Sequence, residues 1–197
     1  MKKMACLLLV FLLFSQVAVA GVESEPGKLL KSSVAQVFTV LSDKELSIDQ
    51  KKSKVIDITN PVFSFSLMAK LSLGKAHWIQ FNAKQRVEFI NLYTELFQNF
   101  YIEKLDFFSN ETVVFQPATI VQKKKVQIQS ALISKGTQYS MRYKMFKTGH
   151  GWKIYDLEIE GVSILRSYRS QYHHFLKKGG IEGLLAKMRE IKENKKK

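Results

Sequence analysis

Residues 151–172 read GWKIYDLEIEGVSILRSYRSQY, and the predicted fold is built outward from this stretch. Its first half, Trp152 to Glu160, is rich in aromatic and β-branched residues, which favour a strand. Gly161 interrupts that run, and the hydroxyl of Ser163 can accept a hydrogen bond from the free N–H groups of a first helical turn. Apolar residues then recur at helical spacing: Ile164, Leu165, Tyr168, Tyr172, Phe175 and Leu176. The stretch therefore predicts a strand that leads directly into an amphipathic helix.

The residues upstream of this stretch alternate between apolar and polar, which is typical of strands. We expect a short strand from Thr112 to Phe115, a longer one from Val121 to Ile133 and a third through residues 139–145. Lys135-Gly136 and residues 148–151 suit the turns between them. Together with the strand at 152–160, these segments predict a meander of about four antiparallel strands joined by short turns.

The N-terminal half and the C-terminus carry apolar residues at helical spacing. The expected helices run through residues 28–41, 47–58, 61–73, 83–105 and 181–191, with Pro61 at the first position of the third. Gly179 suits a left-handed residue at the end of the helix that begins at Ser163. The helix at 83–105 is apolar on more than one face, so it is either buried on several sides or walls a cavity.

Residues 1–20 have the features of a cleaved signal peptide. Two lysines follow the initiating methionine, Cys6 to Phe14 are apolar but too few to span a bilayer, and Ala18-Val19-Ala20 is a small-x-small cleavage site. An uncleaved anchor is the alternative. The mature chain is expected to begin at Gly21 and, because Cys6 is the only cysteine, to contain no disulfide.

The length of 197 residues suits one domain, or one domain with a small subdomain. We expect residues 21–197 to form a single domain, with a helical part at about 28–108, a sheet at about 111–161 and C-terminal helices at about 163–193. The formal net charge of +14 indicates anionic partners such as lipid headgroups or acidic protein faces, or simply a solvated surface. Export argues against nucleic acid as the partner.

The usual motifs of catalysis and metal binding are absent from the sequence. His173 and His174 are adjacent, so on a helix they point about 100° apart and do not share one ion easily. Ser163, His174 and Asp156 could be assembled as nucleophile, base and acid, but no Gly-x-Ser-x-Gly elbow supports this. Asp156 and Glu158 would share one strand face, where salt bridges with basic neighbours are expected. We therefore predict no enzyme activity, no metal and no cofactor.

Several motifs in the C-terminal third are specific enough to indicate a family. They are Gly151 to Leu157, Glu160 to Ser163 and Tyr168 to Tyr172, supported by Tyr143 upstream and Gly180 to Leu184 downstream. In these residues the chain resembles the MlaC family, also called the toluene-tolerance family, over roughly residues 28–191. One departure is Phe63-Ser64-Phe65, where the family usually has Asp between the aromatic residues.

The resemblance implies a periplasmic phospholipid carrier of Gram-negative bacteria. Such a protein moves lipid between an outer-membrane lipoprotein–porin complex and an inner-membrane ABC transporter with an MCE-ring subunit, and so maintains the lipid asymmetry of the outer membrane. The implied fold is α+β: a twisted antiparallel sheet of about four strands packed with helices, similar to nuclear-transport-factor-like folds, plus a small helical subdomain. The acyl chains would lie in an apolar cavity between sheet and helices, with the headgroup towards solvent.

Eight residues are predicted to line that cavity, and ordinary core packing is the alternative for each. They are Phe97, Tyr101, Tyr143, Met145, Leu157, Ile159, Val162 and Leu165. Burying an acyl chain of about sixteen carbons is worth on the order of 13 kcal/mol, which explains why a carrier is needed. A carrier of another apolar lipid, such as a hopanoid, and an enzyme of the same cavity-forming fold type are the alternative functions. Arg169 could pair with Asp156 or contact a partner or a headgroup.

Overall fold

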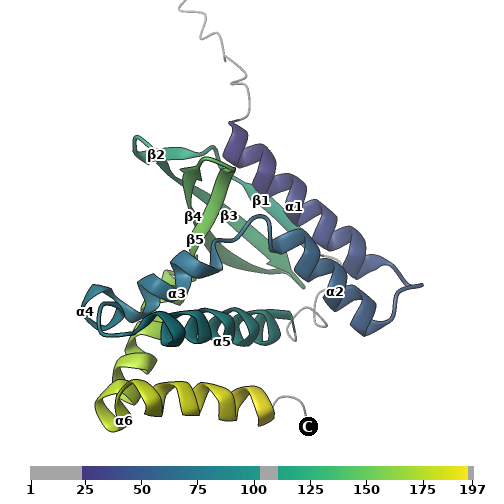
Figure 1. Cartoon of the computed structure of the whole chain (residues 1–197). Coiled ribbons are helices and arrows are strands. Elements are labelled where there is room, and N and C mark those ends of the chain that lie inside the picture. Colours follow the sequence, from purple (N-terminus) through teal and green to yellow (C-terminus); the bar gives the residue numbers. More distant parts are fainter. Residues whose placement is uncertain (1–23, 103–110, 195–197) are drawn as a thin grey trace, which may run out of the picture.

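The computed structural model describes residues 24–102 and 111–194 of the chain, apart from the side chains of residues 101 and 102. Within these ranges an antiparallel sheet is covered by helices on one face and at one end (Figure 1). The helices are α1 (Glu25–Ser42), α2 (Ile48–Thr59), α3 (Phe65–Leu73), α4 (Lys75–Trp78), α5 (Ala83–Ile102) and α6 (Ile164–Asn194). The strands are β1 (Thr112–Phe115), β2 (Thr119–Gln122), β3 (Lys125–Ser134), β4 (Thr137–Thr148), β5 (Gly151–Ile159) and β6 (Val162–Ser163). The predicted α+β class is confirmed.

The sheet follows the order β1-β3-β4-β5-β6, and β2 pairs with β3 beside β1. The expected meander is present, but the described part of the chain has six strands rather than about four. The predicted strand from Val121 to Ile133 is split, because the chain turns at Lys123-Lys124 and Gln122 pairs with Lys125. The second additional strand is the two-residue β6, which pairs with the end of β5.

A β-bulge in β5 determines which of its residues face the helices. Tyr143 pairs with Leu157 and Met145 pairs with Ile154, so the register shifts by one residue between these two pairs. Ile154 and Leu157 therefore both lie on the apolar face, although they are three residues apart. Asp156 pairs with Lys144 and lies on the opposite face.

The predicted cap at Ser163 is confirmed, and a buried carboxylate reinforces it. The Ser163 hydroxyl accepts from the backbone N–H of Arg166 at 3.2 Å and donates to Asp156 Oδ2 at 2.9 Å. Asp156 also accepts from the N–H of Leu165 at 3.3 Å and from Lys144 Nζ at 3.0 Å. One carboxylate thus joins β4, β5 and the first turn of α6.

The start of α3 and the bend in α6 differ from the prediction. Pro61 does not begin a helix, because the backbone after it pairs with β5: Ile154 donates to Val62 O at 2.8 Å and accepts from Ser64 N at 2.9 Å. The left-handed residue of α6 is Gly180, with φ 62°, one position later than expected. There the helix turns back, so that its second half lies beside α5 (Figure 1).

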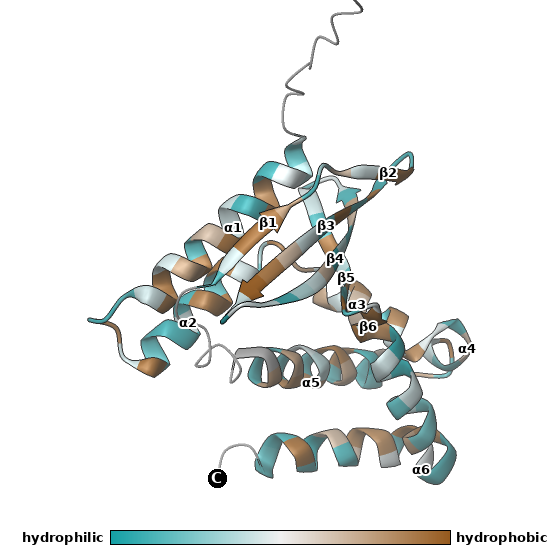
Figure 2. Cartoon of the chain, turned by 180° about the vertical axis from the view of Figure 1, so that it is seen from behind, coloured by the Kyte–Doolittle hydropathy of each residue, from teal (hydrophilic) through white to brown (hydrophobic). Residues whose placement is uncertain are grey.

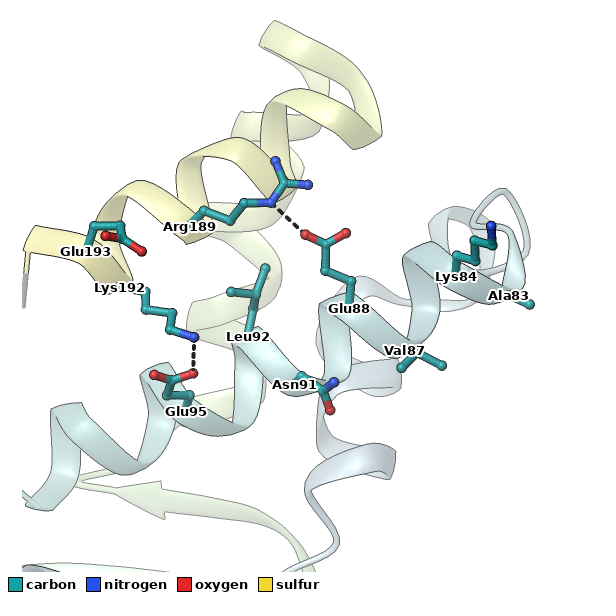
Figure 3. A pocket seen from close by; sticks show the side chains of 10 residues that line it. All are labelled: Ala83, Lys84, Val87, Glu88, Asn91, Leu92, Glu95, Arg189, Lys192 and Glu193. Carbon is teal, nitrogen blue, oxygen red and sulfur yellow. Dashed lines mark hydrogen bonds and ion pairs between the residues drawn. The ribbon is translucent and has the colours of Figure 1, made fainter.

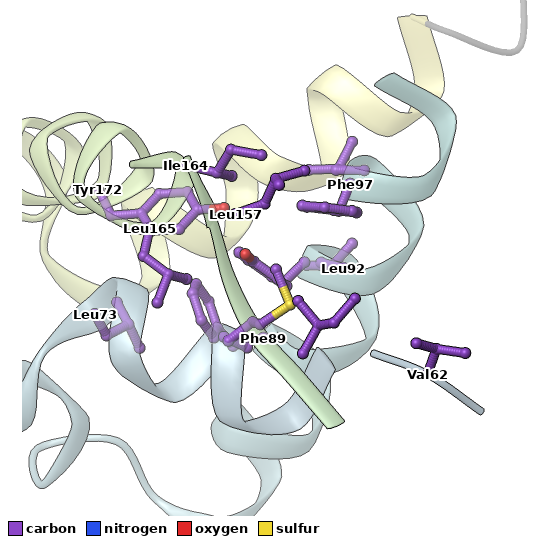
Figure 4. Packing of buried hydrophobic residues seen from close by; sticks show 14 of the residues in the cluster. Val62, Leu73, Phe89, Leu92, Phe97, Leu157, Ile164, Leu165 and Tyr172 are labelled. Atoms are coloured by element: carbon purple, nitrogen blue, oxygen red, sulfur yellow. The ribbon is translucent and has the colours of Figure 1, made fainter. Parts of the chain in front are cut away.

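Helices α3, α5 and α6 and strand β5 share a tightly packed core (Figure 4). Phe89 of α5 is fully buried, and its ring centroid lies 5.3 Å from that of Tyr172 and 5.7 Å from that of Phe81. Because α5 packs against both α3 and α6, much of its broad apolar surface is buried, which was one of the two alternatives that the sequence left open; Leu96 and Phe100 also line a cavity, which was the other. No helix in residues 24–102 or 111–194 has the length and apolarity that crossing a bilayer requires. The predicted signal peptide lies outside the described residues.

We expect Asp156→Ala to lower the free energy of unfolding by about 3–5 kcal/mol, because the substitution leaves buried donors of Lys144 and Ser163 without this carboxylate. Urea denaturation of purified protein measures the change. Arg166→Ala is the matched control: its guanidinium lies 3.7 Å from Glu158 and its side chain is 71% exposed, so its effect stays within about 0.5 kcal/mol. If both substitutions lowered the free energy of unfolding equally, the Asp156 carboxylate would not be the group that stabilises the junction of β4, β5 and α6.

Candidate apolar binding site

Helix α1 lies over the apolar face of the sheet, but most of its side chains are not buried against that face. Only Pro26, Gly27 and Leu30 are buried, whereas the apolar residues of its later turns stay half-exposed. Its first residue is tied to the sheet, because Glu25 Oε2 accepts from Lys147 Nζ at 2.9 Å and from Trp152 Nε1 at 3.2 Å. Its last turn is tied to α2 through Lys51 Nζ, which donates to Leu41 O at 2.8 Å. The helix is therefore held at its two ends and lies over the sheet between them.

A cavity of about 210 Å³ lies between α1 and the sheet. Its wall consists mainly of aliphatic and aromatic side chains: Leu30, Val34, Val37, Phe38 and Leu41 from α1, Val62 and Phe63, and Val113, Leu132, Met141, Tyr143, Ile154 and Leu157 from the sheet. Most ligand pockets have about 300–1,000 Å³, so this one would have to widen to enclose a long hydrocarbon chain.

The polar atoms of this wall already have partners within the protein. Ser33 Oγ donates to Leu29 O at 2.9 Å, and Thr59 Oγ1 donates to Val55 O at 2.8 Å. The hydroxyl of Tyr143 contacts Met141 Sδ at 3.7 Å, and burial raises the pKa of Tyr143 to about 12. The phenol is thus neutral at physiological pH. Among the described residues, no charged side chain lines the cavity, so it suits an uncharged apolar guest.

The structure distributes the eight predicted residues over three places. Tyr143 and Leu157 line the cavity under α1. Met145, Phe97 and Leu165 are buried in the core, with Met145 fully enclosed. Ile159 and Val162 line a second cavity at the end of β5. The side chain of Tyr101 lies outside the described residues. Contact with a ligand stays a prediction for all eight.

The second cavity, of about 360 Å³, lies between α5, the β5–β6 turn and both halves of α6. Its wall is mostly apolar, and Phe100 and Val162 are exposed at its edge. Tyr172 contributes a buried hydroxyl that has no hydrogen-bond partner within residues 24–102 and 111–194. Burial, and next the charge of Tyr168, raise the pKa of Tyr172 well above the ordinary value, so this hydroxyl is a neutral donor.

A row of aromatic rings runs from the first cavity to the second. Phe63 lines the first cavity, and its ring centroid is 6.0 Å from that of Phe97. Phe97 is 6.0 Å from Tyr93, which in turn is 5.3 Å from Tyr168 in the wall of the second cavity. A continuous series of aromatic ring contacts thus links the wall of the first cavity to that of the second.

A larger groove of about 750 Å³, between α5 and the second half of α6, has a different chemistry (Figure 3). Two ion pairs cross it: Arg189 Nε lies 2.6 Å from Glu88 Oε1, and Lys192 Nζ lies 2.7 Å from Glu95 Oε2. Hydrocarbon placed here would remove these charged groups from water at considerable cost. Size alone therefore does not identify the apolar site.

The carboxylates of β5 form salt bridges, as the sequence predicted. Glu158 Oε2 lies 2.7 Å from Arg142 Nη1, and Glu158 Oε1 lies 2.5 Å from Lys144 Nζ. Burial alone would raise the pKa of Glu158, but the hydrogen bonds and charges of Lys144 and Arg142 outweigh it, and the pKa is lowered. The suggested pair of Arg169 with Asp156 is wrong: Arg169 Nη2 donates to Leu71 O at 2.6 Å, and Lys144 occupies the place beside Asp156.

The structure does not assemble the candidate catalytic trio. Ser163 and Asp156 are hydrogen-bonded, but His174 lies 11 residues beyond Ser163, about 16 Å along the helix. His174 is exposed, with its ring beside that of Phe175. In the residues that the structure describes, no group of three or more His, Cys, Asp or Glu side chains is placed to hold a metal ion.

Only Tyr143 and Leu157 of the cavity wall were among the eight predicted residues, and the largest group that was not predicted comes from α1. Val34, Val37, Phe38 and Leu41 were recognised as one helical stripe but not as the wall of a cavity. The same spacing of apolar residues occurs in a helix that is packed fully into a core. The spacing alone therefore does not reveal a cavity beneath the helix. Phe63 was likewise placed in a helix rather than at the cavity.

These features define a class of protein: an α+β fold that encloses an apolar pocket between one helix and an antiparallel sheet. Residues 31–190 match the family model described as MlaC protein, so the chain belongs to the MlaC family, as its motifs predicted.

Two known proteins illustrate the relationship. The chain is 23% identical over 177 residues to a Haemophilus influenzae protein named intermembrane phospholipid transport system binding protein MlaC, and the match covers 85% of this chain and 82% of that one. It also superposes with a TM-score of 0.79 on a phospholipid-binding protein from Ralstonia solanacearum whose structure was solved in complex with a phospholipid. That match covers 88% of this chain and all of the other at 23% identity, which establishes a shared fold.

Val37→Trp should weaken the uptake of a fluorescent fatty-acid analogue by delipidated protein at least about tenfold, because the indole takes up space that the guest needs. Fluorescence titration measures the affinity. Ala35→Trp places the same ring on the exposed face of α1 and should change the affinity less than about twofold. Equal affinities of the two variants would show that the guest binds elsewhere.

Proposed function

We propose that this protein is a periplasmic phospholipid carrier that moves lipid between the inner and outer membranes. The observation that carries the proposal is the apolar cavity between α1 and the sheet of an MlaC-family chain. The names of the two relatives support it, since one belongs to an intermembrane phospholipid transport system and the other was solved with a phospholipid bound.

In this proposal the lipid enters by displacing α1 from the sheet. The cavity is smaller than one long acyl chain needs, but α1 has no buried residue after Leu30. Moving its later turns outward therefore takes no fully buried side chain of α1 out of the protein, and the buried sheet residues that it uncovers, such as Tyr143 and Leu157, would be covered again by the guest. An acyl chain of about sixteen carbons contributes on the order of 13 kcal/mol of burial, which exceeds the cost of separating a few half-exposed side chains.

A diacyl phospholipid has a second chain, and the second cavity is the nearest apolar space for it. Leu157 lines the first cavity and Ile159 lines the second, and both lie on the same face of β5. The rings of Phe63 and Phe97 belong to the series of aromatic contacts that links the two cavities, and they would turn aside to let the second acyl chain pass. The neutral hydroxyl of Tyr172 could then donate to an ester carbonyl of the lipid.

The wider assignment rests on the family. Residues 1–20 would direct export and be removed, and residues 21–197 would form one lipid-binding domain. The carrier would exchange lipid with an outer-membrane lipoprotein–porin complex and with an inner-membrane ABC transporter that has an MCE ring, and so maintain outer-membrane lipid asymmetry. Binding without catalysis suits the cavity under α1, because its described walls hold no cluster of free polar side chains.

Native mass spectrometry of protein purified from cells, without detergent, tests the proposal. We expect a population of the chain that carries one phospholipid, and tandem spectra should release fatty acids and a headgroup. If a different apolar lipid, such as a hopanoid, were identified instead, the protein would still be a lipid carrier, but phospholipid would not be the lipid that it carries. A chain that is always free of lipid would contradict the function.

Val162→Glu tests the place of the second chain. A carboxylate at the edge of the second cavity should lower the retention of diacyl phospholipid about tenfold and leave that of a monoacyl lysophospholipid unchanged, because a charge is costly beside hydrocarbon. Val87→Glu is the matched control, since Val87 is 61% exposed on α5 and Val162 is 60% exposed. Unchanged diacyl retention in Val162→Glu would restrict the lipid to the cavity under α1.

A further inference from the structure

The β2–β3 hairpin has a composition unlike that of the rest of the surface. Lys123, Lys124 and Lys125 follow one another around its turn, and all three are exposed. Ile120 is 77% exposed and Val121 is 50% exposed, directly beside the lysines. Figure 2 shows this apolar part of β2 next to the hydrophilic turn, at the end of the sheet away from α5 and α6. Exposed aliphatic side chains within a group of cations form a surface that is both apolar and basic.

The turn of this hairpin carries three consecutive cations, although the neighbouring Lys147 is paired with Glu25, and Arg142 and Lys144 are paired with the carboxylates of β5. Residues 112–155 contain eight Lys and Arg residues and no Asp or Glu. By contrast, the β3–β4 turn at the other end of the sheet lies near two carboxylates, since Glu111 accepts from Ser134 Oγ and Glu160 from Ser140 N. The two ends of the sheet therefore differ: three consecutive lysines stand at the β2–β3 turn, whereas the single lysine of the β3–β4 turn, Lys135, has carboxylates nearby.

The tip is held in place rather than free to fold away. The N–H of Lys147 donates to Lys124 O at 2.9 Å, which fixes the turn to the end of β4. Lys125 Nζ lies 5.9 Å from the centroid of the Tyr155 ring. Ile120 pairs with Val126, and the register shift that follows places Val121 in a bulge. In this arrangement Ile120 and Val121 are both exposed, although Val126, the partner of Ile120, is buried.

We propose that this hairpin is a membrane-contact element that inserts Ile120 and Val121 between the headgroups of an anionic bilayer while its lysines bind the lipid phosphates. The alternative, an acidic protein partner, fits the tip less well. Protein interfaces are depleted in Lys and enriched in aromatic residues and Arg, and they bury about 800 Å² on each side, which is more than a narrow two-stranded tip offers. Aliphatic residues next to lysines suit the interface of a membrane, where lysine chains extend towards the headgroups.

The proposal does not depend on the cargo in the cavities, so its test is separate from that of the proposed function. Delipidated full-length mature protein is mixed with vesicles of phosphatidylcholine alone or with phosphatidylglycerol added, and bound protein is measured by co-flotation. We expect binding to the anionic vesicles only, and its loss in high salt, because at 1 M ionic strength charges are screened beyond about 3 Å.

Two sets of variants separate the two parts of the tip. Each lysine near an anionic bilayer strengthens binding about fivefold, so Lys123→Gln with Lys124→Gln should weaken it about 25-fold. Ile120→Ser with Val121→Ser keeps the charge and should weaken binding at least about tenfold. The matched control, Ile133→Ser with Lys135→Gln, alters the opposite hairpin and should change binding less than about twofold.

Three results would overturn the proposal. The first is that the wild-type protein does not bind anionic vesicles. Binding of the hairpin tip to an acidic protein in place of vesicles would count as the same result. The second is an equal loss in the control and the tip variants, which would assign binding to overall charge. The third is full binding by the Ile120 and Val121 variant, which would exclude insertion. Thermal unfolding monitored by circular dichroism confirms that each variant is folded.

Discussion

The carboxylate of Asp156 is the interaction on which the rest of the structure depends. It accepts from Lys144 on β4, from the Ser163 hydroxyl and from the first turn of α6, and it is 4% exposed. A buried charge is tolerated only where such donors surround it. Because β5 continues into α6 at this point, the direction of the helix relative to the sheet follows from these bonds.

This junction separates two parts of the molecule with different tasks. Beyond it, α3, α5 and α6 pack around the buried rings of Phe89 and Tyr172, and the second cavity lies between α5 and the two halves of α6. On the other side, α1 lies over the sheet and leaves a cavity beneath Val34, Val37 and Phe38. The buried side chains of the helices are concentrated in the first part, whereas α1 has none after Leu30, and segments with few buried contacts open most easily.

The candidate site could be predicted from the sequence only in part. Tyr143 and Leu157 were predicted because their strands alternate and their motifs resemble the MlaC family, and both line the cavity under α1, although contact with a lipid stays a prediction. Met145 satisfies the same pattern but is fully buried, since apolar periodicity identifies the inward face and not the distance to the opposite layer. The bulge in β5 could not be predicted for a similar reason. It depends on how β5 pairs with β4, and no local pattern in residues 151–159 reveals that pairing.

The sequence by itself determined most of the helices and strands, the α+β class, the cap at Ser163 and the family, because these follow from residue spacing and short motifs. Only the tertiary structure decided that α1 stands away from the sheet, that two cavities lie along one face of β5 and that Lys144 rather than Arg169 pairs with Asp156. The physical reason is that a cavity and an ion pair depend on distances between segments far apart in the chain, whereas spacing within a segment reports only which side of it is apolar.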